Sequence, residues 1–245
     1  MNRKSRGGEK TRVLFVNPPV LVADGFVDFP CFANLGMLHC AGAAEAAGFS
    51  VDVADAFSAG DAVKVKKQGG AFLLGCGIDE VLHGFEKKDY AAVVVCLSVF
   101  HQPFAASAET KKAFKRIKEV FPRARIIAAD AYIGGMHYID YAAEPFFKRY
   151  PHADELVRYE SEAVIIRCLK NEAVKKHTVH LPSKEELSAP LDSFAPPAWH
   201  LIDTVSYGAF LKEFFTKAGG GGALLEMLPL LPVSASRGCL FSCSF

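Results

Sequence analysis

The sequence predicts an α/β fold in which a doubly wound parallel sheet of about five strands carries helices on both faces. Short apolar runs alternate with helical segments along residues 12–170. The apolar runs are continuous and rich in β-branched residues, which is typical of parallel strands buried on both faces. The segments between them are long enough for a helix to connect one parallel strand to the next. This arrangement is Rossmann-like, and the composition, 51% hydrophobic and 22% charged, supplies the core that it needs.

The first half of this region contains three expected strands and two expected helices. The first helix is rich in small residues and ends at Gly48, since glycine commonly caps helix C-termini. A glycine-rich loop, Gly69–Gly77, precedes the second and shorter helix. In order, the elements are a strand at Val13–Val16, a helix at Leu35–Ala47, a strand at Val51–Ala54, a helix at Ile78–Phe85 and a strand at Ala91–Leu97.

The second half continues the alternation of strands and helices. Its first helix is charged and amphipathic and is stopped by Pro122, because the residue before a proline disfavours the helical conformation. Its last strand is short and is expected at an edge of the sheet. In order, the elements are a helix at Ala105–Val120, a strand at Arg125–Ala129, a short helix at Glu144–Arg149, an edge strand at Glu155–Arg158 and a helix at Ser161–Lys170.

After Lys170 the character of the sequence changes. Residues 171–228 begin as a polar, proline-bearing stretch, which predicts an interdomain linker with a weak helix at Tyr207–Lys217 and a flexible turn at Gly219–Gly222. Leu230–Ser234 then indicates a new strand, so residues 229–245 are expected to begin a second domain. Residues 1–11 are a basic tail that is expected to be disordered.

Charge and hydropathy argue against several classes of function. The net charge is +1, so no surplus charge favours nucleic acid or an anionic membrane surface. No stretch is long and apolar enough to cross a bilayer. Five of the seven cysteines are scattered through apolar surroundings, as expected for reduced thiols in the core of a cytoplasmic protein: Cys31, Cys40, Cys76, Cys96 and Cys168.

Polar and glycine residues follow the expected strands, where ligands of doubly wound sheets bind. Asn17 and Ser98 follow the first and third strands, and Gly134-Gly135 follows the fourth. None of these turns has the glycine spacing of a dinucleotide or nucleoside triphosphate loop. Each has a structural alternative: a turn residue for Asn17, a helix N-cap for Ser98 and a tight turn for the glycines. His101 and His137 follow the same strands and are further candidates for ligand contact.

The C-terminal residues carry the most specific pattern in the chain. Cys239 and Cys243 have C-x3-C spacing, and the chain ends at Phe245, where one more cysteine would complete C-x3-C-x2-C. Ordinary ferredoxin clusters use four cysteines, so a loop with three thiolates suggests a cuboidal iron–sulfur cluster with one open iron. Because the third cysteine is not in this chain, two thiolates alone are expected to hold such a cluster poorly.

Six short segments occur in a fixed order along residues 12–245. They are V-N-P-P at 16–19, N-L-G-M-L at 34–38, G-G-M-H at 134–137, Y-E-S-E at 159–162, P-A-W-H-L at 197–201 and S-R-G-C-L-F-S-C-S-F at 236–245. In this order the sequence resembles the cobalamin-binding-domain radical S-adenosylmethionine (SAM) enzymes. The fourth segment keeps both acids of that family's G-E-G-E and loses both glycines. The D-x-H-x-x-G signature of histidine-ligated cobalamin proteins is absent.

The resemblance implies three cofactors, namely cobalamin, a 4Fe–4S cluster and S-adenosylmethionine. The open iron would bind S-adenosylmethionine, and an electron delivered through the cluster by a reductant protein would cleave it to a 5′-deoxyadenosyl radical. In methylating members, cobalamin relays the methyl group. The resemblance also assigns residues: Cys239 and Cys243 as metal ligands, Asn17, Ser98, Gly134, Gly135 and His137 as cobalamin contacts, and Phe245 beside the adenine.

The same resemblance implies a division into domains. Residues 12–170 would form the cobalamin-binding-like Rossmann domain, residues 171–228 the linker, and residues 229–245 the start of a truncated radical SAM domain. Three hypotheses stay open on the sequence. The chain is the front part of a radical enzyme, inactive alone because the third cysteine and the barrel are missing; or it is a stand-alone corrinoid-binding module; or it is a degenerate domain that binds nothing.

The end at Phe245 has three interpretations. Cysteine codons differ from UGA by one base, so the end is compatible with an incomplete sequence, a nonsense mutation or a selenocysteine codon read as a stop. A selenolate would be a suitable soft ligand for iron. The sequence indicates neither the substrate nor the type of reaction.

Overall fold

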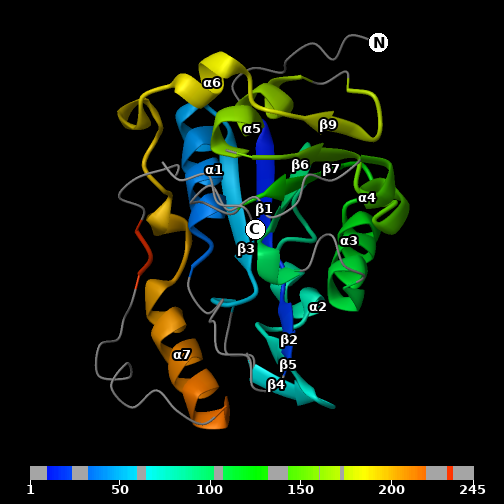
Figure 1. Cartoon of the computed structure of the whole chain (residues 1–245), viewed down its shortest axis with the longest axis vertical. Helices are drawn as coiled ribbons and strands as arrows, with labels where there is room; N and C mark the ends of the chain where they lie inside the picture. The colour runs from blue at the N-terminus through cyan, green and yellow to red at the C-terminus, as the bar shows by residue number, and fades with distance from the viewer. Residues whose placement is uncertain are drawn as a thin grey trace, which may run out of the picture.

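The chain folds into two β-sheets with helices packed around them (Figure 1). The computed structural model describes residues 10–23, 33–59, 65–101, 107–131, 143–159, 161–171, 174–218 and 231–233. The larger sheet has six strands in the order β3-β1-β6-β7-β8-β9. These strands are β1 (Arg12–Asn17), β3 (Ser50–Asp55), β6 (Ala92–Leu97), β7 (Arg125–Asp130), β8 (Glu155–Val157) and β9 (Thr178–His180).

Every pair of neighbours in the six-stranded sheet is parallel. β1 lies inside the sheet, where Val13 is opposite Val51 of β3 on one side and Ala92 of β6 on the other. β6 is buried along its whole length, because helices cover both faces of the sheet. The predicted α/β fold with a parallel sheet is therefore confirmed.

Two details of the predicted sheet are wrong. It has six strands and not about five, and the strand predicted at Glu155–Arg158 is not at an edge, because β9 pairs with it. β9 lies in the segment that was predicted to be a linker. It consists of Thr178, Val179 and His180, and its partner strand, more than its own sequence, makes it a strand.

The helices divide between the two faces of the sheet. Figure 1 shows α1 and α5 on one side and α3 and α4 on the other; α1 contacts α5, and α2 contacts α3. Their bounds are α1 (Leu35–Ala46), α2 (Ile78–Leu82), α3 (Ala108–Val120), α4 (Ala143–Arg149), α5 (Ser161–Lys170), α6 (Lys184–Ser188) and α7 (Thr204–Ala218), with short 3-10 turns at Val99–His101, Leu191–Ser193 and Trp199–Leu201.

Capping side chains set the ends of these helices. The Asn34 side chain accepts a hydrogen bond from the Met37 N–H at the start of α1, and Gly48 has φ of 95° just beyond its end. α3 begins at Ala108 and not at Ala105, because the Ser107 hydroxyl caps it by accepting from the Thr110 N–H. α2 ends at Leu82, earlier than predicted.

A second, antiparallel sheet has the strand order β2-β5-β4 and was not predicted. It consists of β2 (Val20–Ala23), β4 (Val65–Gln68) and β5 (Ala71–Leu74), and the two-residue turn Gly69-Gly70 joins β4 to β5. The loop predicted at Gly69–Gly77 is therefore wrong. β2 follows β1 after Pro18-Pro19, so these prolines connect the two sheets.

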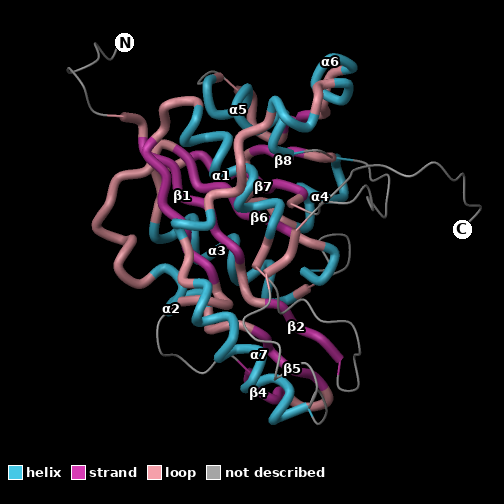
Figure 2. The backbone as a smooth tube through the Cα atoms, turned by 90° about the vertical axis from the view of Figure 1, so that its left-hand side faces the viewer, coloured by secondary structure: helices cyan, strands magenta, loops and turns pink. Residues whose placement is uncertain are grey.

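The segment after the large sheet packs back onto the domain. Figure 2 shows α7 beside the small sheet; the Lys217 ammonium lies 2.7 Å from the Val65 carbonyl oxygen, and the rings of Phe72 and Phe214 meet edge to face. Nearer the middle of the chain, the Ala198 N–H donates to the Leu38 carbonyl oxygen of α1 at 3.0 Å. These contacts attach residues 196–218 to the fold.

Other predictions fall partly on the described residues. Cys40, Cys76, Cys96 and Cys168 are all buried, as predicted for core thiols, and Cys31 lies outside the described residues. Residues 231–233 have no regular secondary structure, and the rest of the predicted strand Leu230–Ser234 lies outside the described residues, as does Gly219–Gly222. Among the helices that the structure describes, none combines the length and the apolar character that a membrane crossing requires.

Candidate ligand site at the carboxyl edge of the sheet

The strand order places a topological switch point between β1 and β6. From β1 the chain first adds β3 on one side and later adds β6, β7, β8 and β9 on the other. Open α/β sheets bind ligands outside the carboxyl ends of the strands at this point. Here those ends are Asn17 of β1 and Ser98, the residue after β6.

Asn17 joins the ends of two strands and the start of α1. Its side-chain amide donates to Asp55 Oδ1 at 2.8 Å, and its oxygen accepts from Asn34 Nδ2 at 3.2 Å. Only 1% of Asn17 is exposed. The side chain predicted as a ligand contact therefore holds Asp55 and Asn34 in place, and any influence on a ligand passes through those partners.

Asp55 is a buried carboxylate that the sequence did not single out. Its Oδ1 also accepts from the Phe57 N–H at 3.0 Å, and the Tyr207 hydroxyl of α7 donates to Oδ2. Burial raises the pKa of Asp55 to about 6, although the hydrogen bonds from Asn17 and Phe57 act in the opposite direction. The position of Asp55 at the end of an apolar strand is a sequence signal for a site residue. Its partner Tyr207 could not be predicted, because it lies 152 positions away on α7.

Ser98 and His101 form a compact pair at the end of β6. The Ser98 N–H donates to His101 Nδ1 at 2.9 Å, and the Ser98 hydroxyl lies 3.0 Å from the same nitrogen. His101 Nε2 lies 2.8 Å from the Pro18 carbonyl oxygen, which can only accept. These contacts fix the neutral tautomer with the proton on Nε2, so the Ser98 hydroxyl donates to Nδ1 and keeps its lone pairs for another partner.

The pair has the connectivity of a serine nucleophile, a histidine base and an orienting acceptor. Its electrostatics do not suit that role. Burial lowers the pKa of His101 to about 4, although the hydrogen bonds to Pro18 and Ser98 act in the opposite direction. The orienting group is a neutral carbonyl and not a carboxylate, so nothing in the pair stabilises an imidazolium. The arrangement favours a fixed hydrogen-bonding site over a nucleophile.

We expect the Ser98–His101 pair to show no esterase activity. Hydrolysis of p-nitrophenyl acetate by the full chain should proceed at the same rate in the wild type and in Ser98→Ala, because His101 cannot hold the serine proton near neutral pH. The measurement is the release of p-nitrophenol between pH 6 and 8 (about the range in which a serine–histidine pair works). A loss of tenfold or more in Ser98→Ala would show instead that Ser98 is a nucleophile.

The surroundings of the pair are apolar and lack basic side chains. Ser98, Val99 and Phe100 are half-buried and lie between β6 and the buried His101. Among the described residues that follow β1, β3, β6 and β7, up to positions 23, 59, 101 and 131, none is a lysine or an arginine. Anionic groups such as phosphates therefore find no cation on this part of the edge, and neutral polar groups suit it better.

The remaining predicted site residues cannot be placed at this edge. Gly134, Gly135, His137, Cys239, Cys243 and Phe245 all lie outside the described residues, so the structure does not test their positions. Ser98 is therefore the predicted contact that is only partly buried at the switch point, and Asn17 is a buried residue at the end of the neighbouring strand β1.

Comparisons with known proteins give weak structural likenesses. No family model and no curated protein matches the chain. A putative phosphomethylpyrimidine kinase from Bacteroides thetaiotaomicron is 12% identical, with 67% of this chain and 54% of that one covered and a TM-score of 0.29. A pyridoxal kinase from Entamoeba histolytica is 14% identical, with 64% of this chain and 54% of that one covered and a TM-score of 0.28. A phosphomethylpyrimidine kinase from Clostridium difficile is 12% identical, with 84% of this chain and 94% of that one covered and a TM-score of 0.32. The chain thus spans about half the length of the first two.

The expected membership of the cobalamin-binding radical SAM family is wrong. Solved structures to which the chain is similar include phosphomethylpyrimidine, pyridoxal and PfkB carbohydrate kinases, and no family model supports the resemblance. Cobalamin, the 4Fe–4S cluster and S-adenosylmethionine are withdrawn as cofactors, together with the radical-enzyme and corrinoid-module hypotheses. At TM-scores below 0.5, the likenesses carry no kinase activity over to this chain either.

Two of the segments that suggested the family, 34–38 and 197–201, have local structural roles in the described part of the chain. Asn34 caps α1, and Gly36 lies so close to the Ala131 carbonyl that a Cβ there would overlap it. In the fifth segment, the Ala198 N–H bonds to the Leu38 carbonyl oxygen of α1. Helix caps, glycine contacts and turns of this kind serve any α/β fold. The architecture therefore accounts for these two segments without a cofactor.

Proposed function

We propose that this α/β domain binds a small, neutral, polar molecule at the switch point between β1 and β6. The observation that carries the proposal is the hydroxyl of the partly buried Ser98, at the carboxyl end of β6, which lies 3.0 Å from His101 Nδ1 and directs its proton to that nitrogen. The serine oxygen then presents lone pairs to an N–H or O–H group of the ligand. Val99 and Phe100 supply apolar surface beside it, which is the usual composition of a small-molecule site.

Three further features support this proposal. His101 stays neutral around pH 7, so the orientation of the serine hydroxyl is constant. Asn17 and Asp55 hold the neighbouring strand ends rigidly, which lowers the entropy lost on binding. No described residue directly after β1, β3, β6 or β7, up to positions 23, 59, 101 and 131, is a lysine or an arginine, which disfavours phosphorylated ligands there.

The experiment is a binding assay with matched neutral and phosphorylated compounds. The panel has three pairs: adenosine and adenosine monophosphate, inositol and inositol phosphate, and nicotinamide and its mononucleotide. We expect saturation-transfer NMR on the full chain to detect binding of neutral members of these pairs. Ser98→Ala should weaken the binding of the detected neutral compound about tenfold, which corresponds to the loss of one hydrogen bond. The Ser98 N–H still bonds to His101 in this variant, so the fold is retained.

Ser188→Ala is the matched control. Ser188 ends α6, is exposed and donates to the Glu185 carbonyl oxygen far from the switch point, so this variant should bind like the wild type. Equal binding by Ser98→Ala and Ser188→Ala would contradict the assignment of Ser98. Stronger binding of the phosphorylated members would contradict the neutral ligand, and no binding across the panel would favour a domain that binds nothing.

The expectations about location and partners belong to the same proposal. A reducing, cytoplasmic location is supported by four buried free thiols, those of Cys40, Cys76, Cys96 and Cys168. The net charge of +1 supports small molecules over nucleic acid or an anionic membrane as partners.

A further inference from the structure

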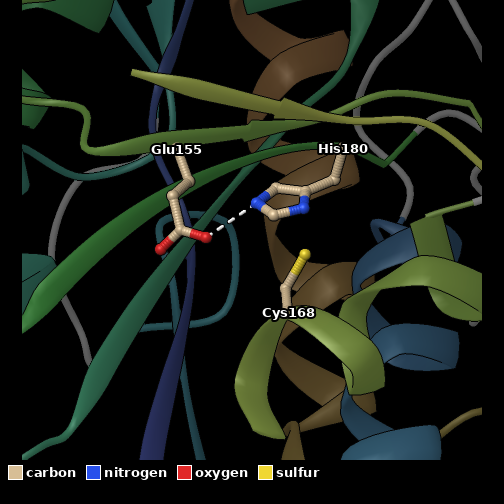
Figure 3. Close-up of side chains that lie close together, drawn as sticks. All are labelled: Glu155, Cys168 and His180. Atoms are coloured by element: carbon tan, nitrogen blue, oxygen red, sulfur yellow. Dashed lines mark hydrogen bonds and ion pairs between the residues drawn. The ribbon is translucent and has the colours of Figure 1, made fainter. Parts of the chain in front are cut away.

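A second cluster of reactive side chains lies near the β8–β9 edge of the large sheet, which is the edge opposite to β3 and away from the switch point. Glu155 of β8, Cys168 of α5 and His180 of β9 each offer one ligand atom, and these atoms all lie within 4.8 Å of one another. Figure 3 shows the Cys168 sulfur pointing from its helix toward the His180 ring, with Glu155 facing the same ring. His180 Nε2 is 2.8 Å from Glu155 Oε2.

All three side chains are enclosed by the fold. Glu155 is 1% exposed, Cys168 is fully buried and His180 is 8% exposed. They come from three consecutive elements, β8, α5 and β9, and the spacing of positions 155, 168 and 180 resembles no metal-binding motif, so the cluster could not be predicted from the sequence. Within the described part of the chain, this is the group of three such ligands that the structure brings together.

Arg125 completes the surroundings of the carboxylate. Its guanidinium donates to Glu155 Oε1 through Nε at 2.8 Å and Nη2 at 2.6 Å, and Nη2 also donates to the Cys168 carbonyl oxygen at 3.0 Å. One oxygen of Glu155 is thus held by Arg125, and the other faces His180 and Cys168. Ligating carboxylates are commonly fixed by such outer partners.

We propose that Glu155, Cys168 and His180 bind a zinc ion, with a water molecule as the fourth ligand. The set of one thiolate, one imidazole and one carboxylate suits a borderline-soft ion, and Zn²⁺ accepts all three in tetrahedral geometry. Bonds of about 2.0–2.3 Å place tetrahedral ligand atoms about 3.3–3.7 Å apart. The Glu155–His180 contact, 2.8 Å in the structure, then opens by somewhat under an ångström. The Cys168 sulfur, which lies within 4.8 Å of both partner atoms, moves into the same range.

The exchange of protons on loading is defined by the contacts. In the metal-free state the carboxylate can only accept, so His180 Nε2 carries a proton that it donates to Glu155. On loading, Nε2 binds the ion and the imidazole proton is carried by Nδ1. The Cys168 thiol loses its proton to solvent as the S–Zn bond forms. Starting from a neutral imidazole, one proton is released for each ion bound.

Such an ion would fix the outer edge of the sheet. β9 has three residues and pairs only with β8 among the described strands, so its own attachment is weak. A metal bonded to β8, β9 and α5 would hold this strand and the segment that follows it against the domain. Zinc binding should then stabilise the folded chain by mass action.

The experiment uses Co²⁺ as a visible probe for the zinc site. The full chain carries Cys239→Ser and Cys243→Ser, so that those thiols cannot compete, and it is titrated without oxygen. We expect one Co²⁺ per chain with a sulfur-to-cobalt charge-transfer band, which Zn²⁺ removes. Cys168→Ala should abolish the band. Cys96→Ala should retain it, because Cys96 is also fully buried but lies on β6, two strands from β8.

His180→Gln provides the second variant, which decides the outcome if Cys168→Ala does not fold by circular dichroism. Glutamine keeps a donor for Glu155 and lacks the imidazole lone pair, so Co²⁺ affinity should fall at least about tenfold. The proposal is overturned by a parent chain without a saturable band, by a band of equal intensity in Cys168→Ala, or by unchanged affinity in His180→Gln.

Discussion

Replacing Gly36 by alanine is expected to lower the free energy of unfolding by about 3 kcal/mol. Gly36 lies in the first turn of α1, and an added Cβ would overlap the carbonyl of Ala131, which follows β7. Both sides of this contact are backbone, so relief requires α1 or the end of β7 to move. The better helix propensity of alanine, about 1 kcal/mol, offsets only part of this cost.

The measurement is the urea unfolding midpoint of the full chain, followed by circular dichroism. Gly70→Ala is the matched control, because a Cβ at Gly70, in the turn between β4 and β5, has no neighbour within 4 Å. We expect the control to stay within about 1 kcal/mol of the wild type. Equal stability of Gly36→Ala and Gly70→Ala would show that α1 does not approach β7 as closely as described.

The second large effect is on the pH dependence of stability, to which Asp55 and His101 contribute with opposite signs. Burial raises the pKa of Asp55 from 3.8 to about 6 and lowers the pKa of His101 from 6.5 to about 4. Between pH 4 and 6 the folded state holds a proton on Asp55 that the unfolded state has lost. The contribution of Asp55 to the free energy of unfolding therefore falls as pH rises. Over pH 4 to 6.5 the unfolded state holds a proton on His101 that the folded state lacks. The contribution of His101 to the free energy of unfolding therefore rises with pH.

Each contribution amounts to about 3 kcal/mol across its range, and in the wild type they largely cancel. Single variants should separate them. The free energy of unfolding of Asp55→Asn, relative to the wild type, should rise by about 3 kcal/mol between pH 4 and 6.5. That of His101→Gln should fall by a similar amount. Asparagine retains the acceptor for Asn17 and Phe57, so the hydrogen bonds to Oδ1 are kept.

Urea denaturation of the three proteins at half-unit steps of pH provides these differences. Differences from the wild type remove the contributions of the other titrating groups, provided that these groups do not contact the substituted residue. Parallel pH profiles for the wild type and Asp55→Asn would mean that Asp55 is solvated and its carboxylate unperturbed. Parallel profiles for the wild type and His101→Gln would mean the same for the imidazole.

The main sheet and its helices could be predicted because their patterns are local. The runs at Val13–Val16 and Ala91–Leu97 are apolar whatever surrounds them, and Ser161–Lys170 has the bounds of α5 as predicted. The small sheet could not be predicted in the same way. β4 reads Val-Lys-Lys-Gln, and β5 lies in a glycine-rich stretch, so both become strands by pairing. Gly69-Gly70 was the overlooked hairpin signal.

The candidate site shows the same division. Ser98 was found because it follows a clear strand, but the sequence could not show that His101 fixes its proton or that Asn17 is buried under its partners. Tyr207 reaches Asp55 only because α7 packs against the domain, and the segment of α7 was predicted to be part of a linker. Short motifs in a familiar order led to the wrong family, and the described segment at 34–38 has a local purpose in the fold, because Asn34 caps α1 and Gly36 lies against Ala131.

The central position of β1 has a consequence for synthesis on the ribosome. β1 is made first, and the strand that completes its second side, β6, ends about 80 residues later. At roughly 5–20 residues per second, the nascent chain exposes an apolar strand with one unpaired edge for several seconds. Loop closure over this distance is also entropically costly, so the pairing of β1 with β6 should be a late event. The newly made chain is therefore a natural client for chaperones that bind extended apolar segments.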